Sequence, residues 1–304
     1  MRSRAERTTL LAFAGVVLFG ASNIVAVRFS NRELDPFWGA GLRFAVSGAV
    51  MFALVGINGL RVPRGRSLAG AVGYGALAFA FSYALFYVGV QRVPAGLAAV
   101  IMASVPLLTF ILAVVQRLER FRWRGLIGAV VAMTGIALIA AEPPGGAVPL
   151  GSLLLVVGAA MTAAQSGIVV KRLPESHPIT TNAVAMVTGS ALLLAASVVA
   201  DESPSLPTSL SVWIALVYLM VVGTPLLFIC YLTVLERWSA SAASYQFVLF
   251  PPVSVVLGAV LLGEPITTGL LLGVPFVLAG VYVGALSPAA RRDRHATPSP
   301  RHVR

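Results

Sequence analysis

Apolar runs of about 20 residues follow one another along almost the whole chain, and short polar or charged connectors separate them. A helix of this length rises about 30 Å and crosses the hydrocarbon layer of a bilayer. We therefore predict an all-α integral membrane protein with ten transmembrane helices. The predicted spans are residues 8–27, 36–58, 67–90, 95–116, 123–141, 150–170, 179–200, 209–234, 240–262 and 267–287.

The composition supports a lipid-embedded chain. Of 304 residues, 58% are hydrophobic and 11% are charged, whereas soluble domains average about 25% charged residues. The net charge of +11 would suit nucleic acid, but the basic residues stand in short clusters between apolar runs. We expect the lipid bilayer as a partner and no nucleic acid. The single cysteine, Cys230, excludes a disulfide framework or a cysteine-based metal site within the chain, and we expect no metal or cofactor.

The basic residues predict an orientation. If the N-terminus is cytoplasmic and the spans alternate, all but four of the 22 Lys and Arg residues fall on the cytoplasmic side, as the positive-inside rule requires. Arg28, Arg32 and Arg92 fall outside, and Arg43 lies within a span. We predict a multi-pass protein of the cytoplasmic membrane with both termini inside. Residues 288–304 are expected to form a basic, disordered cytoplasmic tail.

An internal repeat divides the chain into two halves, residues 1–141 and 150–287. Each half would hold five spans, and because five is odd, the second half would enter the membrane inverted. The alternative is a duplication that only builds a scaffold. The residues that coincide after a shift of 145 positions include Pro106 with Pro251, Glu119 with Glu264, Gly128 with Gly273, and Gly135 with Gly280.

Short motifs in a fixed order carry a family resemblance. The motifs are Phe19-Gly-Ala-Ser-Asn-Ile24, Gly41-Leu-Arg-Phe44, the segment 82–98, Gly223-Thr-Pro225, Leu262-Gly-Glu-Pro265 and Leu278-Ala-Gly-Val-Tyr282. In these motifs the chain resembles the EamA-like family of the drug/metabolite transporter superfamily over about residues 8–287. The resemblance implies ten helices in two repeats around a central cavity, and metabolite transport, often outward. Pro251-Pro252 departs from the Glu-Pro common in the family and removes an acidic group.

Polar side chains at membrane depth are costly and therefore mark candidate binding residues. Arg43 lies about 10 Å into its span, where it would either anchor an anion or snorkel to the outer face. Asn23 would face either a solute or a neighbouring helix. Tyr83 and Tyr87, four residues apart, share a helix face and would form either an aromatic wall or a packing contact.

Further candidates are weaker. Thr162, Gln165 and Ser166 form a polar stripe on the sixth span, the counterpart of the Asn23 helix in the second half. The other candidate cavity residues are Ser104, Thr224, Tyr231, Tyr245 and Gln246. Pro106, Pro251 and Pro252 interrupt equivalent spans and would act either as hinges or as fixed kinks.

The absence of carboxylates and histidines from mid-span positions of the sequence bears on mechanism, because proton relays through a bilayer use such groups. We expect exchange or facilitated diffusion, or coupling through Glu142 and Glu236 at span ends. The predicted function is a secondary exporter of small amino-acid-like or amphiphilic metabolites that works by alternating access. The alternatives are a carrier of anionic metabolites held by Arg43 and a non-transporting receptor or assembly factor. We do not expect an enzyme; monomer and homodimer stay open.

Overall fold

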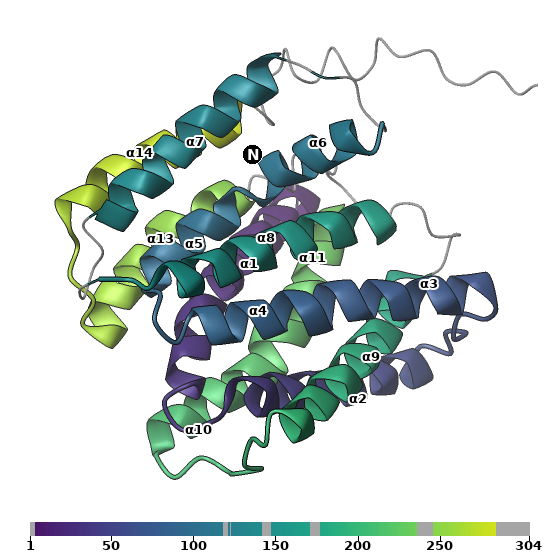
Figure 1. Ribbon diagram of the computed structural model, residues 1–304. Coiled ribbons are helices and arrows are strands. Elements are labelled where there is room, and N and C mark those ends of the chain that lie inside the picture. Colours follow the sequence, from purple (N-terminus) through teal and green to yellow (C-terminus); the bar gives the residue numbers. More distant parts are fainter. Residues whose placement is uncertain are drawn as a thin grey trace, which may run out of the picture.

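The computed structural model describes residues 4–117, 121, 123–141, 147–170, 177–235 and 246–283 (Figure 1). Within these ranges the chain is helical and has no strand. Helix is present in each predicted span. The elements are α1 (Arg4–Ser30), α2 (Pro36–Ile57), α3 (Arg66–Gly75), η1 (Ala76–Phe81), α4 (Ser82–Gly89), α5 (Ala95–Ala103), α6 (Val105–Val115), α7 (Trp123–Ala141), α8 (Leu150–Val170), α9 (Pro178–Val199), α10 (Leu210–Val217), η2 (Tyr218–Leu226), α11 (Leu227–Leu235), α13 (Gln246–Leu262) and α14 (Thr268–Val281).

Seven helical stretches in the described residues are long and apolar enough to cross a membrane. Three of these stretches join consecutive elements: α3–η1–α4, α5–α6 and α10–η2–α11. The apolar helices Trp123–Ile139, Leu249–Leu262 and Thr268–Val281 are shorter. Large apolar side chains such as Leu11, Val130 and Leu154 are exposed on the outside of the bundle, which suits contact with lipid. The total of ten spans stays a prediction.

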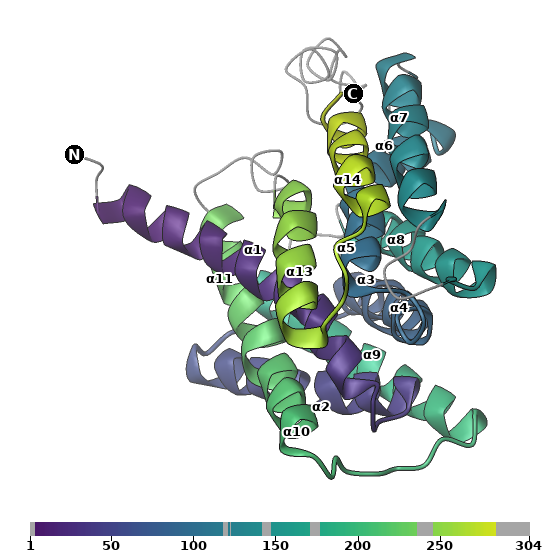
Figure 2. The same cartoon turned by 90° about the vertical axis from the view of Figure 1, so that its left-hand side faces the viewer.

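The corresponding helices α7 and α14 of the two halves pack against each other and run antiparallel (Figure 2). A Cβ added to Gly280 would lie 2.5 Å from the carbonyl oxygen of Gly128, and one added to Gly273 would lie 2.5 Å from that of Gly135. Rising residue numbers on α7 therefore meet falling numbers on α14. The close approach requires glycine, as in other tightly packed membrane helices. α2 and α9 also pack side by side.

Two stretches of π-helix interrupt the third and eighth spans at corresponding places, η1 in the first half and η2 in the second. A π turn widens the helix and leaves its carbonyls less regularly paired, and such turns are frequent at functional sites. η2 also contains Pro225, which has no amide hydrogen to donate. Carbonyls of η2 are therefore available to side chains from other helices.

Five connectors meet at one end of the bundle, which we name the Glu264 end: residues 31–35, 90–94, 147–149, 200–209 and 263–267. Glu33 accepts hydrogen bonds from the amides of Thr208 and Ser209 at the start of α10. Glu202 accepts from the amides of Phe37 and Trp38 at the start of α2. Each carboxylate thereby caps a helix of the other half.

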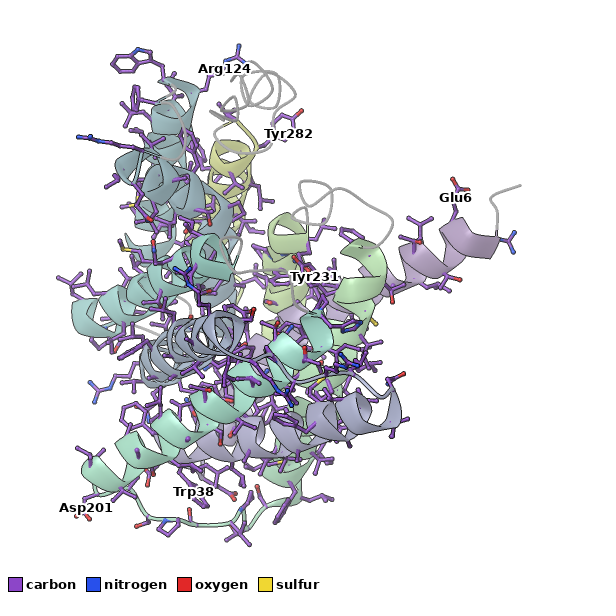
Figure 3. All side chains as sticks on the ribbon, turned by 90° about the vertical axis from the view of Figure 1, so that its right-hand side faces the viewer. Glu6, Trp38, Arg124, Asp201, Tyr231 and Tyr282 are labelled. Atoms are coloured by element: carbon purple, nitrogen blue, oxygen red, sulfur yellow. The ribbon has the colours of Figure 1, made fainter. Side chains whose placement is uncertain are left out.

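Figure 3 shows Trp38 and Asp201 in the lower part of the view and Arg124 and Tyr282 in the upper part. The connector 58–65, which joins α2 to α3, lies away from the Glu264 end. Arg61 and Arg64 in this connector are exposed.

Candidate solute-binding site

Arg43 lies at the centre of a polar cluster inside the bundle. It projects from α2, and only 1% of it is exposed. Its Nε donates to Thr224 Oγ1 at 2.9 Å, its Nη2 to the Gly223 carbonyl at 3.3 Å and its Nη1 to the Tyr87 hydroxyl at 3.4 Å. All three acceptors are neutral, and no carboxylate of the described residues forms an ion pair with Arg43. Arg43 therefore points into the protein and does not snorkel to the outer face.

Aromatic rings cover the faces of the Arg43 guanidinium. Its central carbon lies 5.1 Å from the centroid of the Phe44 ring and 5.2 Å from that of Tyr83. These two rings meet edge to face at 4.6 Å. A cation over aromatic faces gains electrostatic stabilisation that grows when water is excluded. The rings and the neutral acceptors together hold a charge that would cost about 3 kcal/mol at the centre of a bilayer.

The backbone of η2 supplies the acceptors on the opposite side. The Gly223 carbonyl accepts from both Asn23 Nδ2, at 2.5 Å, and Arg43. The carbonyl of Met220, five residues before Pro225, accepts from Ser47 Oγ at 3.0 Å. Side chains of the first half thus satisfy carbonyls of the second half, and the cluster connects α1, α2, α4 and η2.

Asn23 has one unsatisfied acceptor in this cluster. Its Oδ1 is buried and has no hydrogen-bond partner among the described residues. A buried acceptor without a donor costs about 1–3 kcal/mol, so a solute that brings an N–H group would be stabilised there. The cluster therefore combines a fixed cation, which suits a carboxylate, with an acceptor that suits an ammonium group.

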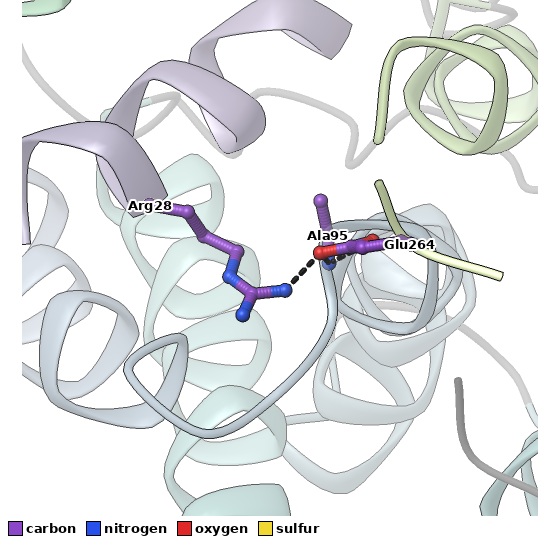
Figure 4. A network of polar contacts seen from close by, with 3 residues as sticks. All are labelled: Arg28, Ala95 and Glu264. Carbon is purple, nitrogen blue, oxygen red and sulfur yellow. Dashed lines mark hydrogen bonds and ion pairs between the residues drawn. The ribbon is translucent and has the colours of Figure 1, made fainter. Parts of the chain in front are cut away.

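A second arginine lies at the Glu264 end. Arg28, near the end of α1, forms an ion pair with Glu264, whose carboxylate also accepts from the amide of Ala95 at 3.0 and 3.1 Å (Figure 4). Glu264 thus caps α5 while it holds α1. Glu264 belongs to the repeat and to a family motif in the sequence, but no role was predicted for it. The available signal was its position in Leu262-Gly-Glu-Pro265, directly after an apolar run.

A sequence model of the EamA-like transporter family matches the chain twice, over residues 7–141 and 150–285. The chain belongs to this family. The resemblance found in the sequence motifs is thereby confirmed, and the protein is a multi-span membrane transporter.

Curated relatives of this EamA-like transporter cover nearly its whole length. The uncharacterized inner membrane transporter YedA of Escherichia coli K12 is 30% identical over 259 residues, which are 84% of this chain and 83% of YedA. A probable amino-acid metabolite efflux pump of Salmonella typhimurium is 27% identical over 301 residues, 95% of this chain and 98% of the pump. A protein crystal structure with 20% identity superposes with a TM-score of 0.64 over 94% of this chain and 98% of its own, which shows the fold alone.

Several other candidates of the transporter have hydrogen-bond partners outside the Arg43 cluster. Gln165 Oε1 accepts from Gln116 Nε2 at 2.6 Å, so this pair joins α8 to the end of α6. Small hydroxyls donate to carbonyls of their own helices, and these belong to Ser104, Thr162 and Ser166.

Two further candidates lie on helices α11 and α13 of the second half. Tyr231 packs beside the small apolar cluster of Ala12 and Val234, and Gln246 is buried at the first residue of α13. Tyr245 and the two carboxylates expected to couple transport, Glu142 and Glu236, lie outside the described residues.

The prolines expected to act as hinges occupy two different settings. Pro106 is near the start of α6, just after the break at Ser104 that separates α5 from α6. Pro251 and Pro252 lie inside α13, which continues through them. Equivalent positions thus carry a helix break in one half and an unbroken helix in the other. Whether any of the three moves stays a prediction.

Proposed function

We propose that this transporter exports small amino-acid-like or amphiphilic metabolites across the cytoplasmic membrane by alternating access. The name of the Salmonella relative, a probable amino-acid metabolite efflux pump, supports the solute class. The chemistry of the central cluster supports it independently, because Arg43 offers a cation and Asn23 Oδ1 offers an open acceptor. An amino acid carries a carboxylate and an ammonium group that suit these two positions.

The proposed transport path lies between two inverted halves, residues 1–141 and 150–287. The double match of the family and the antiparallel pairing of α7 with α14 support this arrangement. We infer that the three shorter apolar helices also cross the bilayer, which gives ten spans in a 5+5 arrangement. The Glu264 end then faces outward and both termini lie in the cytoplasm, as the charge pattern predicts.

The single observation that carries the proposal is the Arg43 cluster itself. Its hydrogen bonds join α2 and α4 of the first half to η2 of the second. A relative movement of the halves must stretch these bonds, and a solute carboxylate is a stronger partner for the guanidinium than the neutral groups it would replace. Solute binding and movement of the halves are thus linked through one side chain.

A second candidate is a carrier of anionic metabolites. It is favoured by one observation, namely that the part of the chain that the structure describes provides no carboxylate partner for Arg43. In this version the solute needs the carboxylate but no ammonium group, and Asn23 Oδ1 plays no role in recognition.

Counterflow in proteoliposomes tests both versions. We expect radiolabelled L-leucine to exchange with internal leucine, with 4-methylpentanoate, its analogue without the ammonium group, competing poorly. Arg43→Gln should lower the rate at least tenfold, whereas Arg64→Gln, at an exposed connector position, should not change it. Repeating the assay with and without a pH gradient reports proton coupling. Equal competition by 4-methylpentanoate favours the anion carrier. Unchanged exchange in Arg43→Gln overturns both versions.

A further inference from the structure

The three basic side chains at the Glu264 end gather around one place. Arg28, Arg32 and Arg92 are the arginines that depart from the positive-inside pattern. They line two cavities of about 150 and 300 Å³ that have Arg28, Glu264 and two other residues in common. Topology signalling disfavours basic residues on this side, so their shared position requires another explanation.

The cavities border the ion pair of Figure 4, which is only partly shielded from solvent. The exposed fractions of its side chains are 24% for Arg28 and 13% for Glu264. Arg32 lies over the Phe29 ring at 4.3 Å, and Arg92 is exposed and forms no ion pair in the described part of the chain. We name the two cavities together the vestibule; three guanidiniums and one carboxylate line it.

We propose that the vestibule is an outer docking site for a zwitterionic solute, which inserts between Arg28 and Glu264. The solute carboxylate forms an ion pair with Arg28, and the solute ammonium forms an ion pair with the Glu264 carboxylate. The proposal rests on the function proposed above and extends it to a second site, through which the solute passes at the outer mouth.

A zwitterion suits the site because it supplies a new partner for each member of the Arg28–Glu264 ion pair. One ion pair is exchanged for two, and neither Arg28 nor Glu264 is left without a partner. A solute with only a carboxylate would separate Glu264 from Arg28, and a solute with only an ammonium group would leave Arg28 unpaired. Separating this partly exposed pair without supplying a new partner loses its favourable interaction. The site therefore discriminates against both singly charged analogues.

The walls of the vestibule favour a solute with a short apolar side chain. Val90 and Leu262 line the smaller cavity, and Val148, Pro94 and Pro265 line the larger one. A volume of about 300 Å³ lies at the lower end of the range for small-molecule sites. L-Leucine is therefore a suitable probe, and 4-methylpentanoate and L-leucinamide are its matched analogues without the ammonium group and without the carboxylate.

Equilibrium binding to the full-length protein in phosphatidylcholine nanodiscs provides the test. Radiolabelled L-leucine is bound, and unlabelled L-leucine, 4-methylpentanoate and L-leucinamide compete. The measurement uses the Arg43→Gln protein as well as the wild type, so that binding at the central cluster is removed. We expect leucine to bind at least tenfold more tightly than either analogue in both proteins.

Two variants assign the selectivity to the ion pair. Glu264→Gln keeps an acceptor for the Ala95 amide but should remove the preference for leucine over 4-methylpentanoate. Arg28→Gln should remove the preference for leucine over leucinamide. A purely structural role would weaken all three ligands alike, and that result overturns the proposal. Arg64→Gln, far from the vestibule, should keep the wild-type order.

Other outcomes separate this proposal from the proposed function. If wild-type protein exchanges leucine and loses this activity in Arg43→Gln, but Arg43→Gln protein binds no leucine, only the vestibule proposal fails. If the vestibule binds leucine with the expected selectivity but no amino acid is transported, only the transport proposal fails. Phosphatidylethanolamine carries the same pair of charges; if leucine binding disappears in nanodiscs of this lipid, its headgroup occupies the site and the solute assignment is overturned.

Discussion

Arg43 and Arg28 are arginines on the consecutive helices α2 and α1, yet they are stabilised in different ways. Arg43 is 1% exposed and donates to a hydroxyl of threonine, a hydroxyl of tyrosine and a backbone carbonyl. Arg28 is partly exposed and pairs with the carboxylate of Glu264. The buried arginine thus has only dipoles as partners, and the arginine near solvent has a full counter-charge.

The difference shows where a charge is available for a ligand. Dipoles hold Arg43 in place but leave its charge without a counter-ion, so an incoming carboxylate would gain a strong partner there. In the vestibule, Arg28 already pairs with Glu264, so a ligand that binds Arg28 must also supply a new partner for Glu264. Leucine exchange should therefore depend on the planar shape of the guanidinium at Arg43, whereas at Arg28 in the vestibule it should depend mainly on the positive charge.

The largest expected effect on leucine exchange comes from replacing Arg43 by lysine, and the same replacement of Arg28 provides the comparison. Arg43→Lys keeps the charge but loses the planar fork that reaches Thr224, Gly223 and Tyr87 together. Losing two charge-assisted hydrogen bonds of about 1.5 kcal/mol each corresponds to about a hundredfold slower leucine exchange. Arg28→Lys keeps an ion pair with Glu264 and should slow exchange by less than about threefold. Proteoliposome counterflow measures both, and equal losses would remove the distinction between centre and mouth.

The positions of the helices could be predicted from the sequence because the signal is local. Each predicted span is an apolar run, seven described helical stretches are long enough to cross a membrane, and proline marks helix starts at Pro36 and Pro178. The glycines of the repeat, such as Gly280, also lie where α7 and α14 approach closely. The π turns could not be predicted, because a widened turn depends on what packs against the helix.

The central site was only partly predictable for a related reason. Arg43 stands out because a charge within an apolar run is expensive wherever it points. Its partner Gly223 contributes a backbone carbonyl, which leaves no mark in a sequence except the nearby Pro225. Thr162 and Ser166 looked equally polar in the sequence, yet they bond to their own helix. A side chain's direction is set by tertiary packing, which one sequence does not reveal.

A second comparison of the two arginine sites measures the free energy of unfolding in place of the rate of transport. Thr224→Val is nearly isosteric but leaves Arg43 Nε without its acceptor at 2.9 Å. An unsatisfied donor on a buried charged group should lower the free energy of unfolding by about 2 kcal/mol. Glu264→Gln removes a partly exposed ion pair, which contributes about 1 kcal/mol or less. Thermal unfolding in detergent ranks the two variants, and a larger loss for Glu264→Gln would contradict the assignment of the costly charge to the centre.

The smallest expected effect concerns pH at the Glu264 end. Hydrogen bonds from Ser209, and then from the Thr208 amide, lower the pKa of Glu33 from its ordinary value of 4.5 to about 2. The folded protein thus holds Glu33 ionised more strongly than the unfolded chain does. This contribution to stability is complete above pH 4.5 and is lost as the pH falls from 4.5 toward 2. Glu33 is partly exposed, so solvent screening keeps the contribution small.

Glu33→Gln provides the test, because glutamine keeps an acceptor for the Ser209 amide but does not titrate. Between pH 6 and pH 3, the midpoint of thermal unfolding should fall slightly less steeply in the variant than in the wild type, and the two curves should approach each other at low pH. Arg43 stays protonated throughout this range, so leucine binding at the centre should not follow the same slope. If both proteins respond identically to pH, the link between the Glu33 carboxylate and the start of α10 does not stabilise the fold.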